Sequence, residues 1–206
     1  MTACRGAAGA MVVIISGPSG VGKDTIIDAV RANHDRPEYD FIVTCTTRAA
    51  RHGEIDGTHY RFMPEAEFLA LRDAGELLEA NLVHGSHWYG TPRSAVCRAL
   101  ERGHHAILKI DVQGAQAVKQ RVPDALLIFL VPPSLEALFG RLRARATETA
   151  DQLEVRQRDA AIELARQGDY DYVVVNETGE VERTAARVAE IIEEERARHP
   201  DRRVEL

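Results

Sequence analysis

Cysteine is scarce in this chain of 206 residues, which contains only Cys4, Cys45 and Cys97. The three residues form no CxxC pair and no Cys/His pattern with metal-ligand spacing. Scattered thiols are typical of proteins from a reducing compartment, and they argue against a disulfide framework. We therefore expect a cytoplasmic protein in which these cysteines are small buried or incidental thiols.

Long hydrophobic runs are also absent. The longest apolar runs, 11–15 and 125–131, fall well short of the roughly 20 residues that span a bilayer. Residues 1–10 are rich in Ala and Gly, carry one arginine and lack the apolar core of a signal peptide. We expect a disordered leader over 1–10, a folded domain from Met11 onward and no membrane partner.

The chain has no excess of positive charge. Its net charge is −6, with 45% apolar and 28% charged residues, which is ordinary globular composition. Nucleic-acid binders usually carry a broad basic face, so no nucleic-acid partner is expected, although a local basic pocket for a small anion fits this composition. The composition is compatible with a monomer and with a homo-oligomer.

Short apolar segments alternate with helical patterns along most of the chain. We expect strands at 11–16, 41–46, 107–112, 125–131 and 172–176. Helical patterns cover 25–33, 92–102, 113–120, 134–145, 152–166 and a terminal helix from Val181 onward. This alternation predicts an α/β fold, a parallel sheet with helices on both faces. Residues 48–89 break it with short polar strands around a helix at 65–72, which predicts a small α+β insert.

Residues 17–23 carry the pattern GxxxxGK between the first expected strand and a helix. Glycines let backbone N–H groups converge on phosphate oxygens, and a helix N-terminus adds partial positive charge. A lysine at this position supplies a full charge to β- and γ-phosphates. The context favours a phosphate-binding loop over a turn that merely contains lysine. The loop residues are Gly17, Pro18, Ser19, Gly20, Val21, Gly22 and Lys23.

The residue after the lysine departs from the usual pattern, because Asp24 stands where Ser or Thr normally ligates Mg²⁺. A carboxylate beside a triphosphate is repulsive unless a metal ion or a basic side chain lies between them. One interpretation is that Asp24 binds Mg²⁺ directly or through water. The other is that Asp24 caps the helix and leaves the metal ion to Thr25, water and phosphates. We weigh the two evenly.

A second set of residues lies in fixed register over 46–62. Its members are Thr46, Thr47, Arg48, Arg51, Glu54, Gly57, Tyr60 and Phe62. Arg48 and Arg51 have no acid between them, and two guanidinium groups can hold a dianionic monophosphate through paired, charge-assisted hydrogen bonds. Either arginine alone would be read as a solvated surface charge, so the joint register carries the prediction.

With this second set, the sequence from Met11 to the end resembles the guanylate kinase family, whose members phosphorylate GMP with ATP. Further matching segments follow in order: Glu79, 88–92, 110–114, 132–134, 145–149 and 175–176. The resemblance implies a P-loop NTPase-type core over 11–43, 93–133 and 157–206, a GMP-binding insert over 44–92 and a helical lid over 134–156. It also implies ATP as phosphoryl donor, with Mg²⁺, and GMP or dGMP as acceptor.

The resemblance assigns the acceptor site to side chains of the insert and one core aspartate. Glu79 reads the base, because a carboxylate accepts from guanine N1–H and the exocyclic amine together, whereas adenine presents an acceptor at N1. Asp111 ends a buried strand, where it positions GMP or water on Mg²⁺. Lys109 stands where some relatives carry a second acid, and we read it as a strand-edge side chain. The remaining acceptor residues are Thr44, Arg48, Arg51, Tyr60, Tyr89 and Thr91.

The resemblance assigns the donor side to the phosphate loop, Asp24, Thr25 and Asn176. Arginines of the lid would fold over ATP, because phosphoryl transfer spreads charge over equatorial oxygens that guanidinium groups stabilise. The implied catalytic residues are Lys23, Arg141, Arg145 and Arg156.

Three alternative functions share some of these features. The GKD loop is also similar to that of ribose-bisphosphate kinases, which would have no need of Glu79. A guanylate-kinase-like binding module without catalysis would typically lack the intact loop and lid arginines present here. A regulatory P-loop ATPase or GTPase would leave the second set of residues unexplained, and no NKxD segment occurs.

Overall fold

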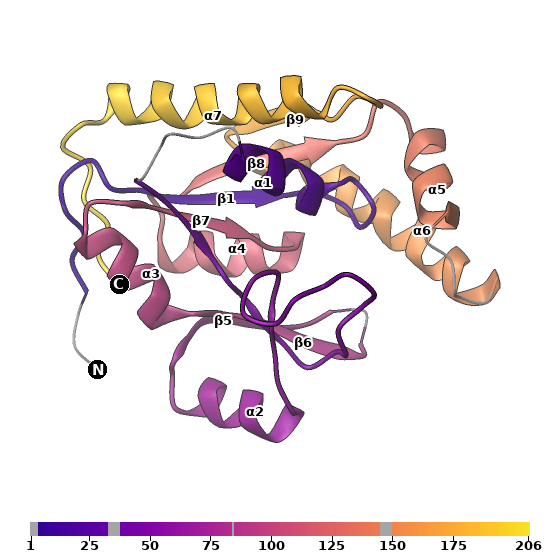
Figure 1. Ribbon diagram of the computed structural model, residues 1–206, viewed down its shortest axis with the longest axis horizontal. Coiled ribbons are helices and arrows are strands. Elements are labelled where there is room, and N and C mark those ends of the chain that lie inside the picture. Colours follow the sequence, from indigo (N-terminus) through magenta and orange to yellow (C-terminus); the bar gives the residue numbers. More distant parts are fainter. Residues whose placement is uncertain (1–3, 33–37, 84, 145–149) are drawn as a thin grey trace.

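Five parallel strands form the core sheet of the protein (Figure 1). The computed structural model describes residues 4–32, 38–83, 85–144 and 150–206. In sheet order the strands are β2 (Tyr39–Ile42), β7 (His105–Lys109), β1 (Val12–Ser16), β8 (Leu126–Val131) and β9 (Tyr172–Val175). Because the strands are parallel, their carboxyl ends meet at one edge, which is where ligands bind in open α/β sheets.

Helices cover both faces of this sheet. They are α1 (Lys23–Ala32), α3 (Arg93–Glu101), α4 (Val112–Arg121) and α7 (Val181–Arg198). Val12 and Ile14 of β1 belong to the core shared with α3 and α4, whereas Val13 and Ile15 belong to the core shared with α1 and α7. Alternate side chains of one strand therefore fill two apolar layers, as expected for a strand buried on both faces. The predicted α/β fold is confirmed.

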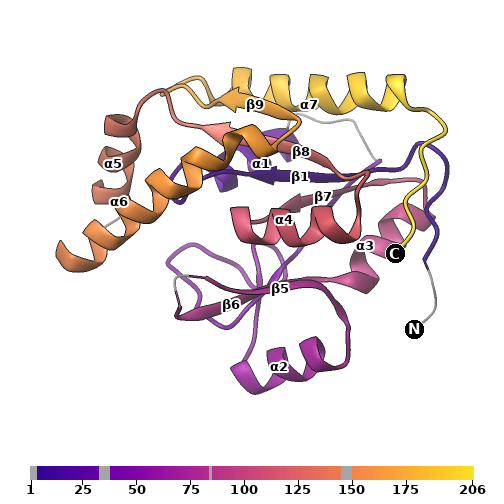
Figure 2. The same cartoon turned by 180° about the vertical axis from the view of Figure 1, so that it is seen from behind.

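A second, smaller sheet lies beyond α4 from the core sheet (Figure 2). Its strands and helix are β4 (Arg61–Phe62), β3 (Cys45–Thr46), β6 (His87–Pro92), β5 (Leu77–Val83) and α2 (Glu65–Asp73). Cys45, Met63, Phe68 and Leu77 form a small core of its own between the sheet and α2. The long β5–β6 hairpin is antiparallel, so this unit is built differently from the parallel core.

The single strand predicted over 41–46 is wrong, because the chain changes sheets there. Ile42 is the last residue of β2 paired with β7, opposite Leu108. Three residues later, Cys45 pairs with Gly90 in the second sheet. The hydrophobic run conceals this change, since both halves are β-structure and neither is exposed.

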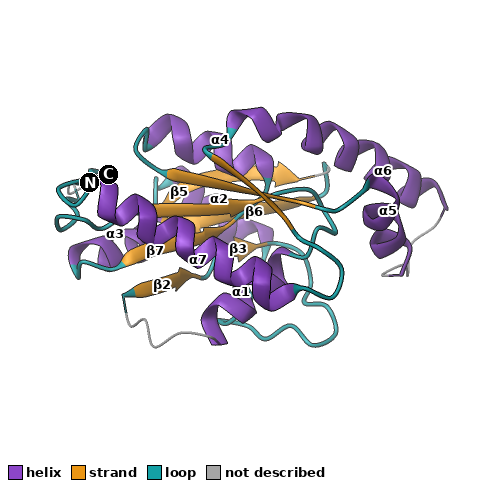
Figure 3. Ribbon diagram, turned by 90° about the horizontal axis from the view of Figure 1, so that it is seen from above, coloured by secondary structure: helices purple, strands orange, loops and turns teal. Residues whose placement is uncertain are grey.

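Helices α5 (Leu135–Ala144) and α6 (Ala150–Leu164) lie together at one end of the molecule (Figure 3). They pack through Leu138, Leu142 and Ala160. The irregular stretch predicted over 146–150 falls almost wholly outside the described residues. Among the helices of the described part, none is long and apolar enough to cross a membrane.

The predicted disordered leader is wrong for residues 4–10. Cys4 exchanges two backbone hydrogen bonds with Leu206, at 2.8 and 2.9 Å, and the N–H of Gly6 donates to Val204 O at 2.8 Å. Cys4 and Ala10 are buried. The Ala/Gly-rich composition allows this close packing, because small side chains let the segment lie against the C-terminal residues. Residues 1–3 lie outside the described part.

Candidate active site

A cavity of about 840 Å³ lies between the carboxyl edge of the core sheet, the second sheet and α6. It brings together most of the side chains that the sequence predicts for both substrates. The predicted residues that line it are Ser19, Gly20, Gly22, Lys23, Asp24, Thr44, Arg48, Arg51, Tyr60, Glu79, Tyr89, Asp111 and Arg156. Arg145 lies outside the described residues.

The phosphate loop has a backbone conformation that only glycine adopts without strain. Gly17 and Gly22 have φ values of 145° and 101°, in the region that side chains disfavour. A Cβ on Gly17 would meet Leu130 O at 2.4 Å. The ammonium of Lys23 donates to Gly17 O at 2.5 Å and Pro18 O at 3.2 Å. Burial lowers the pKa of Lys23, although the nearby Glu163, Asp111 and Asp24 carboxylates oppose this shift.

Two predicted nucleotide-site residues support this loop from outside the cavity. Asn176 Nδ2 donates to Val21 O at 2.7 Å. Arg141 donates to the same oxygen at 3.1 Å and to Asn176 O at 3.2 Å. The structure thus places Arg141 and Asn176 behind the loop, where they fix the backbone, rather than among the residues that line the cavity.

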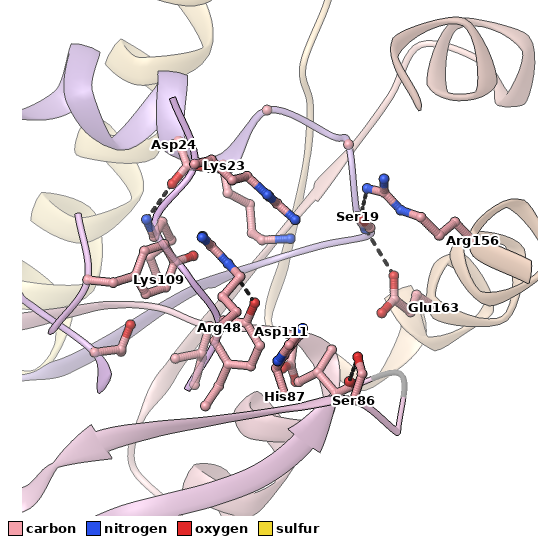
Figure 4. A pocket seen from close by; sticks show the side chains of 18 of the residues that line it. Ser19, Lys23, Asp24, Arg48, Ser86, His87, Lys109, Asp111, Arg156 and Glu163 are labelled. Atoms are coloured by element: carbon pink, nitrogen blue, oxygen red, sulfur yellow. Dashed lines mark hydrogen bonds and ion pairs between the residues drawn. The ribbon is translucent and has the colours of Figure 1, made fainter. Parts of the chain in front are cut away.

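Helix α6 contributes one predicted and one unpredicted residue to the loop. Arg156 donates to Ser19 Oγ at 2.9 Å, and the backbone N–H of Ser19 donates to a carboxylate oxygen of Glu163 at 3.0 Å (Figure 4). An anion therefore already lies against a loop amide, which is the type of donor that binds phosphate. Glu163 was missed because a glutamate in a charge-rich helix reads as solvated.

Asp24 pairs with Lys109 (Figure 4). Because α1 begins at Lys23, Asp24 lies in the first helical turn and is not the N-cap residue, so the capping interpretation is wrong in that form. Thr25 is exposed. The strand-edge reading of Lys109 is also wrong, because its side chain lies 4.4 Å from the Tyr60 ring centroid and is only 12% exposed.

Arg48 lines the cavity and is held by Glu54. Both guanidinium Nη atoms donate to the carboxylate at 2.6 Å, and Nε donates to Tyr89 Oη at 3.0 Å. Tyr60 lies against the guanidinium face at 4.9 Å from the ring centroid. Burial alone would lower the pKa of Arg48, but Glu54 and Tyr89 more than offset it and raise that pKa. The Arg51 backbone also donates to Glu54, at 2.7 Å, while its side chain is exposed.

Glu79 is a buried carboxylate on β5 with two donors. Thr91 Oγ1 donates to one carboxylate oxygen at 2.7 Å, and Asn81 Nδ2 donates to the other at 2.6 Å. Burial raises the pKa of Glu79 to about 7, and the nearby Asp111 adds to the shift, although both donors oppose it. Its side chain thus titrates near neutral pH. Asn81 was not predicted, although alternation along the strand places it on the same side as Glu79.

Asp111 follows β7 at the carboxyl edge of the core sheet and caps α4. Its Oδ1 accepts from the Gly114 N–H at 2.8 Å. A Cβ on Gly114 would lie 3.4 Å from a Glu79 carboxylate oxygen, so the start of α4 runs directly beside Glu79. The described residues contain no group of three or more His, Cys, Asp or Glu side chains placed to hold a metal ion.

Comparison with known proteins adds an independent line of argument. A family model described as guanylate kinase matches residues 9–195. A guanylate kinase from Nocardia farcinica is 46% identical over 167 residues, which cover 81% of this chain and 86% of that protein. A guanylate kinase from Leifsonia xyli is 44% identical over 167 residues, and there the alignment spans 81% of this chain but only 65% of the relative. The crystal structure of guanylate kinase from Anaplasma phagocytophilum superposes with a TM-score of 0.73 at 31% identity, covering 92% of this chain and 87% of that one.

Proposed function

The chain belongs to the guanylate kinase family of ATP:GMP phosphotransferases, and we propose that its cavity holds GMP between Glu79 and Arg48 with ATP on the phosphate loop. The observation that carries this proposal is that the Glu79 carboxylate, the Arg48 guanidinium and the Lys23 ammonium line one cavity. The distribution of the three groups matches the three parts of the reaction, which are a guanine, an acceptor phosphate and a donor phosphate.

Glu79 would select guanine. Its carboxylate accepts from the N1–H and the exocyclic amine of the base, whereas adenine presents a lone pair at N1 and leaves the buried carboxylate without a donor. Thr91 and Asn81 fix the carboxylate from the protein side. Thr44, which is buried and lines the cavity, would add a hydroxyl near the base.

Arg48, Arg51, Tyr60 and Tyr89 would bind the acceptor phosphate. Arg48 is already fixed by Glu54 and Tyr89, so little side-chain freedom remains to be lost on binding. The exposed Arg51 would add a second guanidinium when GMP arrives. Paired arginines suit a dianionic phosphate because their donors are planar and charged.

The phosphate loop and Lys23 would hold ATP, with Arg156 approaching from α6. The acceptor phosphate oxygen needs no strong general base, since its second pKa is about 6. Catalysis would then consist of in-line positioning and neutralisation of charge on the transferring group. Closure of the second sheet and of α5–α6 over both nucleotides would exclude water.

Mg²⁺ would enter with ATP. The donor set fits a metal ion held by phosphate oxygens and water, which is how proteins usually hold Mg²⁺ at nucleotide sites. Asp24 is already paired with Lys109, and Asp111 caps α4 through one oxygen. Asp111, Asp24 and Thr25 remain the candidates for contacts through water. The chemistry supplied by a bound ion would be neutralisation of charge on the phosphates.

An acceptor screen tests this function. Purified protein with MgATP is offered GMP, dGMP, AMP or a ribose bisphosphate, and ADP formation is followed with a coupled assay. We expect turnover with GMP and dGMP and none with AMP or the sugar phosphate. Turnover of the sugar phosphate with none of GMP would reject the proposal.

On the basis of its scattered thiols we propose a cytoplasmic location for this activity.

A further inference from the structure

Lys109 connects the donor and acceptor sides of the cavity, and no role above uses it. It is the last residue of β7, paired in register with Ile15 of β1. Its ammonium meets the Asp24 carboxylate of α1 (Figure 4) and lies 4.4 Å from the centroid of the Tyr60 ring. One cation thus contacts the helix that follows the phosphate loop and a tyrosine proposed to bind the acceptor phosphate.

Asp24 creates an electrostatic difficulty that a hydroxyl at the same position would not create. It directly follows Lys23, and it lines the cavity beside the loop. Two like charges a few ångströms apart repel strongly where water is partly excluded. Without compensation, the Asp24 carboxylate would therefore oppose the binding of di- and triphosphates.

We propose that Lys109 is a positioning residue of the donor site, which neutralises Asp24 and so allows nucleotide phosphates to bind beside it. Asp24 and Lys109 then act as a matched pair, in which loss of the lysine is harmful only while the aspartate remains. The proposal rests on the assignment of the phosphate loop as the donor site, but it does not depend on the identity of the acceptor.

The surroundings of Lys109 keep its side chain protonated and fixed in position. Burial lowers the pKa of this lysine, but Tyr60 and Asp24 more than offset burial and raise its pKa overall. The ring of Tyr60 on one side and the carboxylate of Asp24 on the other fix the ammonium. A side chain fixed in this way neutralises Asp24 without having to move when the nucleotide arrives.

The test is a titration calorimetry cycle with ADP, with the metal ion removed by chelator so that protein charges alone are measured. The variants are Lys109→Met, Asp24→Asn, the double variant and Lys109→Arg. Lys119→Met is the matched control, because Lys119 is a half-exposed lysine on α4 paired with Asp171 and outside the cavity. Thermal unfolding of each variant establishes that it is folded.

We expect Lys109→Met to raise the Kd for ADP about tenfold or more, with the double variant and Lys109→Arg within about threefold of the parent. A KM for ATP that rises in Lys109→Met and recovers in the double variant would support the same conclusion. Unchanged ADP binding in Lys109→Met, or a double variant as weak as Lys109→Met, would overturn the proposal. A parent that binds ADP but ignores GMP would reject the acceptor assignment and leave this test intact.

Discussion

Arg48 and Glu54 form a bidentate ion pair beside the cavity, with both Nη atoms 2.6 Å from the carboxylate oxygens. The side chains are only 7% and 17% exposed, so the pair is largely removed from water. Breaking such a pair leaves a poorly compensated buried charge. Glu54 therefore determines where the Arg48 guanidinium points, so at the proposed site the acceptor phosphate would meet a donor group that is already oriented.

Glu54→Gln tests this relationship. The amide keeps one acceptor but loses the charge, so we expect the free energy of unfolding to fall by about 1–3 kcal/mol. The KM for GMP should rise about tenfold, while the KM for ATP stays near the parent value. Urea denaturation and steady-state kinetics measure the two effects.

Glu67→Gln is the control for that variant. Glu67 pairs with Arg61 in the same insert, but the two side chains are 47% and 56% exposed. An exposed pair contributes about 0–1 kcal/mol, so this variant should match the parent in both measurements. Equal losses in the two variants would show that the Arg48–Glu54 geometry has no special role.

If ionised Glu79 recognises guanine, the affinity of the protein for guanine should increase as pH rises. Its pKa of about 7 means that the carboxylate is mostly protonated at pH 6 and mostly ionised at pH 8. The affinity for guanosine should rise about tenfold over this interval. Guanosine is used in place of GMP because it lacks a titrating phosphate. Calorimetry across the pH range should give a flat, weak profile for Glu79→Gln, and a flat profile for the parent would contradict the assignment.

Burial of the same carboxylate should also lower the free energy of unfolding at high pH. The unfolded chain ionises Glu79 near its ordinary pKa of 4.5, whereas the folded chain ionises it near 7. Burial of protonated Glu79 carries no electrostatic penalty, so below pH 4.5 this residue does not reduce the free energy of unfolding. As pH rises from 4.5 to 7 the free energy of unfolding decreases, and above pH 7 the loss levels off at about 3 kcal/mol. Glu79→Gln should consequently gain stability relative to the parent at pH 8 but not at pH 4.5. Urea denaturation at the two pH values measures this, and equal differences at both would argue against a raised pKa.

Gly17→Ala should disable the phosphate loop. The added Cβ would sit 2.4 Å from Leu130 O at a φ of 145°, and the Val21 side chain 3.2 Å away limits any relaxation. We expect ADP affinity to fall about a hundredfold or more, as for other strained backbone positions of this kind. Gly140→Ala, where a Cβ has nothing within 4 Å, should bind ADP normally. Normal ADP binding by Gly17→Ala would refute the role given to the loop backbone.

Much of the fold follows from the sequence because its signals are local. The alternation of apolar strands and helices and the glycines of residues 17–23 predict the parallel sheet and the loop correctly. The change of sheet between Ile42 and Cys45 was missed, since two short strands in different sheets produce one continuous hydrophobic run. The packing of Cys4 against Leu206 was missed as well, because partners at opposite ends of the chain leave no local pattern.

In the candidate site, too, local patterns were predicted and contacts between distant residues were missed. Arg48 and Tyr60 were predicted from the fixed register over 46–62 and Glu79 from the family resemblance, and the structure gathers all three around one cavity. Lys109 was read as a strand-edge residue because its role depends on Asp24, 85 positions away. Glu163 was missed for the same reason, since its contact with Ser19 joins residues 144 positions apart. Charge pairs between distant elements are decided by tertiary packing, which residue type and spacing do not encode.

If one cavity holds a guanine nucleotide and an adenine nucleotide end to end, a single ligand that joins both should occupy it. Adenosine and guanosine joined through five phosphates form such a ligand, and calorimetric titration measures its binding. We expect one molecule bound per chain, with affinity far above that of either ADP or GMP and with competition against both. A bisubstrate ligand that binds no more tightly than ADP, or that leaves GMP binding undisturbed, would contradict it.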